Sequence, residues 1–185
     1  MGDRPSAYLE GELVLLRGLE RSDLTAQYLA WLNDPDVNRH LFVGRAPSTR
    51  ESLEAFFDGV VKNPNVVMFA IIERESGRHI GNVKLEMYDT VSRVVDWGIV
   101  IGEKELWGRG ICQEVARLTT RYAFDRLNAH KITLGVSGGH DAAVAAYENV
   151  GFQVEGRQRQ QIYEMGRYVD KVLMGLLRGD LAIEE

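Results

Sequence analysis

The chain has 185 residues, of which 45% are hydrophobic, and this is enough apolar material for one substantial core. Its net charge of −5 argues against nucleic acid as the main partner, because phosphate binding depends on clustered lysine and arginine, and it is compatible with a cationic substrate such as an amine. No apolar run approaches the roughly 20 residues that a membrane span needs, and the amino-terminal residues do not follow a signal-peptide pattern.

The single cysteine, Cys112, cannot form an internal disulfide, which predicts a reducing, cytoplasmic location. No internal repeat, linker or low-complexity segment divides the sequence. We therefore expect residues 1–185 to form one domain.

The first third of the chain predicts one strand followed by two helices. Residues 13–18 have the pattern of an edge-type strand. Ser22 or Asp23 is placed to cap a helix that ends before Pro35, because a proline restricts the residue before it. The apolar positions of this helix fall on one face: Leu24, Tyr28, Trp31 and Leu32.

A second helix opens with a capping box at residues 48–51 and stops at residues 63–65, Asn-Pro-Asn. Helical spacing predicts one buried stripe along it. Five apolar residues make up this stripe: Leu53, Phe56, Phe57, Val60 and Val61.

The remaining pattern predicts six more strands and two more helices. The strands are expected at 66–73, 79–88, 93–102, 131–137, about 152–162 and 167–177. The helices are expected after residue 110 and at 140–152. The element order is therefore β-α-α-β-β-β-α-β-α-β-β. Its β-α-β-α part requires parallel pairing across a crossover helix, whereas the flanking hairpins are antiparallel, so we predict a mixed α/β sheet.

Gly108, Arg109 and Gly110 form a flexible, cationic turn at the start of the long helix. Free N–H groups and the helix dipole make such a position suited to phosphate, although two close glycines before a helix also occur as a plain turn. A Walker loop is excluded because Gly110 is followed by Ile111 and Cys112, and a dinucleotide fingerprint is excluded because position 113 is glutamine.

Several motifs lie around this turn in a characteristic order. They are DWGIVIGEKELWGRGICQEV (96–115), NAHKITLGVSGGHDAAVAAYENVGF (128–152), the earlier Trp-Leu-Asn-Asp-Pro at 31–35, and Ile-Gly-Asn at 80–82. From about residue 12 to 178, the chain resembles the GNAT superfamily of acetyl-CoA-dependent N-acetyltransferases, most closely its RimJ/RimL-like branch. This resemblance implies the GNAT fold, acetyl-CoA as co-substrate, no metal, and direct attack of an amine without an acyl-enzyme.

The resemblance also implies a set of cofactor-binding residues: Ile99, Val100, Ile101, Trp107, Gly108, Arg109, Gly110, Ile111, Cys112, His140 and Ala143. The strand residues are expected beside the pantetheine arm, and the loop is expected to hold the pyrophosphate. Two positions depart from the usual pattern. Cys112 stands at the last loop position, where relatives have glycine or alanine, and His140 stands where they often have asparagine, which leaves the contact of His140 with pantetheine open.

Tyr147 is the candidate general acid, because the resemblance places its hydroxyl near the thioester sulfur; packing in the core is the alternative. Asp96 interrupts an apolar strand and is the candidate base, with a structural ion pair or a chain of water molecules as alternatives. Cys112 at a helix N-terminus would have a lowered pKa. We nevertheless do not assign it as a nucleophile, because no histidine partner is near in sequence and the family uses none.

The acceptor side is expected to include Trp31, Asp34, Phe42 and Tyr88, although Trp31 also fits core packing and Asp34 fits a turn before Pro35. We expect a small-molecule amine as acceptor: an amino sugar, an aminoglycoside or a polyamine. A protein N-terminus and a non-catalytic CoA-binding role are the alternatives. The polar stretch 157–168 is compatible with a solvated hairpin or with pairing across a homodimer.

Overall fold

The computed structural model describes residues 7–181, which form one eight-stranded sheet in the order β1-β2-β3-β4-β5-β6-β8-β7. The strands are β1 (Leu9–Glu10), β2 (Val14–Gly18), β3 (Val66–Glu73), β4 (His79–Asp89), β5 (Val94–Ile101), β6 (Lys131–Ser137), β7 (Gln153–Glu164) and β8 (Arg167–Leu177). β5 and β6 pair in parallel, whereas the neighbouring pairs β4–β5 and β6–β8 are antiparallel. The predicted mixed sheet is confirmed.

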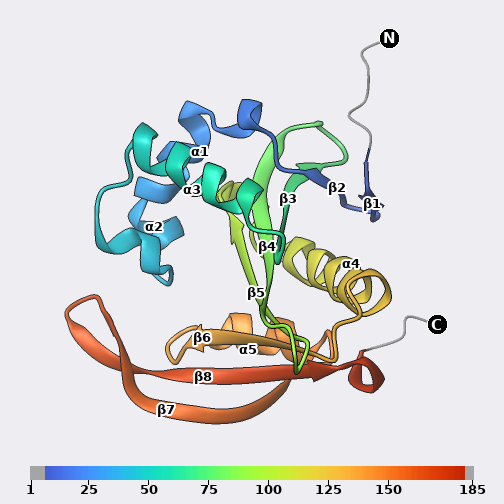
Figure 1. Ribbon diagram of the computed structural model, residues 1–185. Coiled ribbons are helices and arrows are strands. Elements are labelled where there is room, and N and C mark those ends of the chain that lie inside the picture. Colours follow the sequence, from blue (N-terminus) through green and yellow to red (C-terminus); the bar gives the residue numbers. More distant parts are fainter. Residues whose placement is uncertain (1–6, 182–185) are drawn as a thin grey trace.

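The helices cover both faces of this sheet (Figure 1). They are α1 (Ala26–Asn33), α2 (Pro35–Asn38), α3 (Arg50–Lys62), α4 (Ile111–Arg126) and α5 (Asp141–Glu148), with short 3-10 turns η1 (Arg21–Asp23), η2 (Phe42–Arg45), η3 (Lys104–Leu106) and η4 (Arg178–Asp180). The predicted order is found, with β1 and α2 added. Within residues 7–181, no helix is long and apolar enough to cross a membrane.

Two predictions about the first strand and helix were wrong. β2 is not an edge, because the short β1 pairs with its outer side. α1 is capped by Thr25, whose Oγ1 accepts the amide of Tyr28 at 3.2 Å, rather than by Ser22 or Asp23. Asp23 is instead buried in an ion pair with Arg17 at 2.6 Å. The local sequence pattern does not show this pairing.

α3 differs from expectation in its cap and its buried face. The capping box joins Thr49 to Ser52, which exchange side-chain and backbone hydrogen bonds. Leu53 and Phe57 are buried, but Phe56 and Val61 are 44% and 66% exposed. The buried stripe is narrower than predicted because α3 packs over only one end of the sheet, together with α1.

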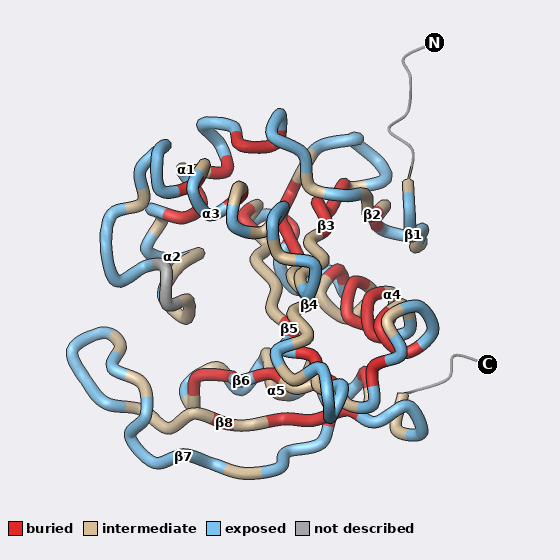
Figure 2. Tube along the Cα trace, in the orientation of Figure 1, coloured by how far each residue is buried: buried red, intermediate tan, exposed pale blue. Residues whose placement is uncertain are grey.

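The main core lies between the sheet and α4 (Figure 2). Val115 and Ala116 of α4 are fully buried against it. Trp97 of β5 donates its indole N–H to Thr119 Oγ1 at 2.9 Å, so the one polar atom of this large side chain is satisfied within the core. This contact fixes α4 on β5, directly beyond the glycine turn.

β5 and β6 separate partway along their length. Val94–Asp96 pair with Lys131–Thr133, but β5 continues to Ile101 and β6 to Ser137 with no further pairing between them. Two parallel strands that diverge leave one edge of each strand open beyond the last pair. The open edge of β5 leads directly to the glycine turn.

Candidate functional site

The glycine turn holds two residues in the left-handed region of backbone conformation. Gly108 has φ of +75° and Gly110 has φ of +83°. A side chain would strain either position, so glycine is required here by conformation. Gly110 is the N-cap of α4, and no side chain caps this helix.

The amino-terminal turn of α4 therefore has free donors. The first helical hydrogen bond runs from Glu114 N–H to Gly110 C=O at 3.0 Å, so the amides of residues 111–113 precede it. Together with the positive end of the helix dipole, these amides fit a pyrophosphate. Arg109 is exposed beside them.

A hollow beside the turn is a poorer place for phosphate. It is lined by Glu12, Leu13, Glu73, Arg74, Glu75, Leu106, Arg109 and Ile111. Its three glutamates outnumber its two arginines, so an anion gains little there. The anion-binding groups of this region are the α4 amides.

The open edge of β5 presents backbone groups at alternate residues. Gly102 N–H donates to Ile80 C=O on β4 at 2.9 Å, so strand alternation directs the backbone groups of Ile101 and Ile99 away from β4. Trp107 Nε1 donates to Ile101 C=O at 3.0 Å. This leaves Ile99 as the residue whose N–H and C=O fit the amides of a pantetheine arm, whereas the backbone of Val100 turns toward β4.

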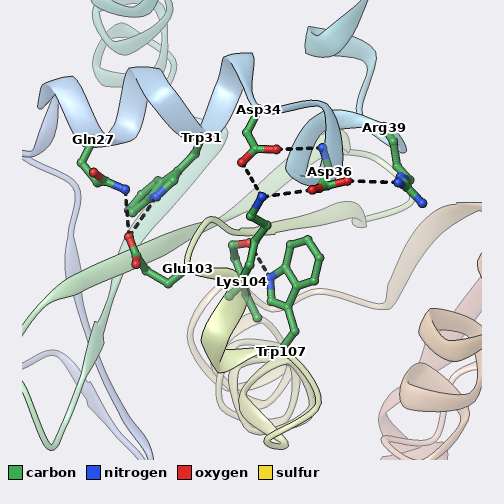
Figure 3. A network of polar contacts seen from close by, with 9 residues as sticks. Gln27, Trp31, Asp34, Asp36, Arg39, Glu103, Lys104 and Trp107 are labelled. Atoms are coloured by element: carbon green, nitrogen blue, oxygen red, sulfur yellow. Dashed lines mark hydrogen bonds and ion pairs between the residues drawn. The ribbon is translucent and has the colours of Figure 1, made fainter.

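A polar network ties the start of this loop to the first helices (Figure 3). Glu103 Oε1 accepts from Trp31 Nε1 at 3.0 Å and from Gln27 Nε2 at 3.1 Å. Lys104 Nζ lies 2.9 Å from Asp34 and 3.0 Å from Asp36. The loop and the α1–α2 region are thereby held in one arrangement.

Tyr147, on α5, is buried beside β5. Its ring packs edge-on against Trp97 with ring centroids 5.5 Å apart. Its hydroxyl lies near the Cys112 thiol and interacts with it. Burial raises the pKa of Tyr147 well above its usual value, and the neighbouring Cys112 adds to this, so the hydroxyl keeps its proton.

The expected lowering of the Cys112 pKa was wrong. Burial raises the pKa of this thiol to about 11, and the hydrogen bond from Tyr147 only partly opposes it. Desolvation of the thiolate outweighs the helix dipole at this position. Cys112 is thus a small, protonated side chain in the first turn of α4, and it does not have the character of a nucleophile.

Asp96 lies on the face of β5 opposite to Trp97, at the last pair before β5 and β6 separate. The side chain remains open to solvent, yet its pKa is raised. Desolvation is the main cause, Lys84 and Lys171 oppose it, and Glu86 adds to it. Asp96 contacts no single cation closely enough to form an ion pair among the described residues, so the structural ion pair considered above is not found.

His140 is the N-cap of α5 and stacks on His40, with ring centroids 4.3 Å apart. His40 Nδ1 lies 3.2 Å from Glu164, which also accepts from Ser137 Oγ at 2.8 Å. Burial lowers the pKa of His140, with the neighbouring His40 as the next cause. This cluster links the turn after α2 to the β7–β8 hairpin. Ala143 lies half-buried on the next turn of α5.

Two of the four acceptor candidates are neighbours, because Asp34 N–H donates to Trp31 C=O at 3.3 Å, whereas Tyr88 lies on β4. Trp31 is buried in the packing of α1 and α3, and Asp34 caps α2 and pairs with Lys104, whose hydrogen bond lowers the Asp34 pKa. Tyr88 is 61% exposed near the end of β4. Phe42 begins η2, but its side chain lies outside the described residues.

Glu114 is a structural residue that the sequence analysis did not single out. From the first turn of α4, its carboxylate accepts the amides of Glu12, Leu13 and Val14, at 2.9 Å for Leu13 and 3.0 Å for Val14. Only a glutamate in the first turn of the helix hinted at it in sequence. In the described part of the chain, no group of histidine, cysteine, aspartate or glutamate side chains is arranged to hold a metal ion.

Comparisons with known proteins agree with this geometry. The family model described as "Acetyltransferase (GNAT) domain" matches residues 14–153. A spermidine N(1)-acetyltransferase of Escherichia coli (strain K12) is 30% identical over 168 residues, which cover 87% of this chain and 84% of that protein. A Bacillus subtilis (strain 168) protein, YdaF, which has the provisional name of a ribosomal N-acetyltransferase, is 28% identical over 174 residues, covering 90% and 92% of the two chains.

Solved structures show the same relationship. The crystal structure of spermidine N-acetyltransferase from Vibrio cholerae in complex with CoA and spermine matches with a TM-score of 0.83 and 27% identity. The match covers 92% of this chain and 98% of that one. The residues that the family model matches, 14–153, include the glycine turn, α4 and α5.

Proposed function

The chain belongs to the GNAT acetyltransferases and is an acetyl-CoA-dependent N-acetyltransferase; from this premise we propose that its acceptor is a primary amine of a small molecule, with polyamines as the favoured class. The relatives named for spermidine acetylation support the class, and so does the net charge of −5. Amino sugars and aminoglycosides remain within the proposal. The likeness to YdaF supports placement near the RimJ/RimL-like branch and makes a protein N-terminus the second candidate.

The observation that carries the proposal is the position of Asp96 and Tyr147 on the two faces of the sheet. Asp96 opens to one face of β5, while Tyr147 contacts Trp97, the next residue, from the other. Both lie where β5 separates from β6. A thioester held at this separation has a base on one side and a phenol on the other.

Acetyl-CoA supplies the acetyl group as a thioester, with its pyrophosphate on the α4 amides and its pantetheine arm along Ile99. Asp96 takes a proton from the acceptor ammonium, directly or through water, so that the amine nitrogen has a free lone pair. The amine nitrogen then attacks the carbonyl carbon and forms the C–N bond, the C–S bond breaks, and Tyr147 gives its hydroxyl proton to the departing sulfur. The nitrogen loses its second proton through water, and a proton returns to the Tyr147 oxygen.

The test measures free thiol released from acetyl-CoA with spermidine, spermine, putrescine, glucosamine, kanamycin and short N-terminal peptides as acceptors. We expect the highest kcat/KM with a small-molecule amine. A higher kcat/KM with the peptides would replace this proposal by the second candidate. Mass spectrometry of the product identifies the acetylated nitrogen in either case.

A further inference from the structure

The face of the sheet that Asp96 shares carries five other charged groups. On β4, Lys84 lies opposite Gly98 and Glu86 lies opposite Asp96 itself, and these two side chains pair at 2.7 Å. Lys131 of β6 pairs with Glu155 of β7 at 2.6 Å. The fifth group is Lys171 of β8, which is opposite Ser137 on β6.

Lys171 does not extend straight out from β8 but lies over β6. A Cβ atom built at Gly135 would lie 2.1 Å from Lys171 Cε and 3.0 Å from Nζ. Gly135 is two residues from Thr133 on the same face of β6, and Thr133 is the partner of Asp96. The lysine side chain therefore runs along the sheet from the level of Ser137 toward Asp96, and the missing side chain of Gly135 makes room for it.

The other positive charge near Asp96 is largely used by a neighbour. Lys84 is held by Glu86 at 2.7 Å, so its effect on Asp96 is offset by a carboxylate of the same strand. Lys171 has no carboxylate at comparable distance among the described residues. It is thus the cation near Asp96 whose charge no ion pair cancels.

We propose that Lys171 is a positioning residue for acetyl transfer, and that Gly135 allows its ammonium group to be held beside the Asp96 carboxylate. The proposal rests on the proposed function, in which Asp96 accepts the proton of the amine. Lys171 does not touch the reacting atoms. It acts through Asp96, because a nearby positive charge favours the ionised carboxylate, which is the form that can take a proton.

Two kinds of substitution test this. Lys171→Met removes the charge and keeps a similar length, whereas Lys171→Arg keeps the charge. Gly135→Ala keeps Lys171 in the sequence but displaces its side chain, because the added methyl group would lie 2.1 Å from its Cε. The displaced atom is the end of a flexible side chain, so the strand itself need not move. Lys62→Met, at the exposed end of α3, is the control for the loss of one lysine charge.

The first readout does not depend on activity. The side-chain carboxyl of Asp96 is followed by ¹³C NMR as the pH is raised from about 3 to 8, with Asp96→Asn used to assign the signal. Lys171→Met and Gly135→Ala are expected to move the Asp96 midpoint up by about 0.5 to 1 pH unit, whereas Lys171→Arg and Lys62→Met leave it in place. An unmoved midpoint in both Lys171→Met and Gly135→Ala overturns the proposal.

The second readout is the pH profile of kcat/KM with the best amine. The acidic limb is expected to move upward by the same amount in Lys171→Met and Gly135→Ala, with KM for acetyl-CoA unchanged. A uniform loss of activity with an unmoved limb contradicts a role through Asp96. If the wild-type protein releases thiol with none of the amines, the proposed function fails, and the NMR titration still decides whether Lys171 acts on Asp96.

Discussion

Tyr147 on α5 lies near Cys112 in the first turn of α4, and the interaction between hydroxyl and thiol raises the pKa of Tyr147 beyond the effect of burial. A thiol is a weak acceptor, and a thioester sulfur arriving nearby competes for the same proton. Cys112 therefore competes only weakly with a thioester sulfur for the proton of Tyr147.

Tyr147→Phe is expected to lower kcat about tenfold or more, because the departing thiolate loses its proton donor. The affinity for CoA, measured by calorimetry, is expected to stay the same. Tyr163→Phe is the control, since Tyr163 is 56% exposed on β7 and stacks on Tyr168. An unchanged kcat in Tyr147→Phe would leave this residue with a packing role only.

Cys112→Ala is expected to keep kcat within about threefold of the wild-type value, because no covalent intermediate is formed on this thiol. With the pKa of Cys112 raised to about 11, alkylation by iodoacetamide at neutral pH is expected to be slower than for free cysteine. The turnover rate and the rate of alkylation are both measured on the folded protein. A loss of activity as large as that of Tyr147→Phe would restore the nucleophile hypothesis.

Gly110→Ala places a side chain at φ of +83°, at the N-cap of α4. The strain costs about 1 kcal/mol and disturbs the amides of the first turn, so KM for acetyl-CoA is expected to rise several-fold. Gly77→Ala is the matched control, because Gly77 has φ of +70° in the β3–β4 turn, with open space around it. The two variants are expected to lose similar stability, and only the first is expected to bind acetyl-CoA less well. Equal KM values would contradict the role of this turn.

Asp96→Asn is expected to lower kcat/KM by about a hundredfold while leaving the protein at least as stable at neutral pH. The sign follows from the raised pKa of Asp96: the ionised form is disfavoured in the folded state. This destabilisation of the folded state grows as the pH rises from the ordinary pKa of a carboxyl group to the raised pKa of Asp96. Asparagine carries no charge and therefore removes it. Thermal unfolding at pH 4 and pH 7 measures the effect, with Asp58→Asn on the surface as control. A Tm for Asp96→Asn below that of the wild type at neutral pH would contradict it.

His140 is expected to make the protein less stable in mild acid. Because burial lowers its pKa in the folded state, the unfolded chain binds a proton more readily. Stability is therefore full above the ordinary histidine pKa and falls as the pH drops from there to the lowered value. His140→Gln is expected to flatten this part of the Tm profile, whereas His130→Gln, at an exposed position, leaves it unchanged. A profile unaltered by His140→Gln would exclude this source of acid sensitivity.

Local pattern was sufficient to predict most elements of the fold. Period-two and helical spacing located the strands and helices, and proline and glycine marked several of their ends. The misplaced features depend on distant partners. Asp23 looks like a helix cap until Arg17 lies beside it, and Phe56 looks buried until α3 is placed over only one end of the sheet.

In the candidate site, too, the features that depend on distant partners could not be predicted from local pattern. The glycine turn was recognisable because a helix start and two glycines are local features. The position of Lys171 over Gly135 was not, because it depends on the register between β6 and β8. His40 and Glu164 are 124 residues apart in sequence, and nothing near either residue indicates the contact.

The hydrogen bonds between the Glu114 carboxylate and the amides of residues 12–14 offer a way to detect a bound cofactor. We expect residues 12–14 to exchange their amide hydrogens when the hydrogen bonds to the Glu114 carboxylate open, and Glu114 lies in the first turn of α4, directly after the amides of residues 111–113 that fit the pyrophosphate. Occupying the turn raises the free energy of opening there. We therefore expect hydrogen exchange of these amides, about 100 residues before Glu114 in the chain, to slow as acetyl-CoA occupies the glycine turn.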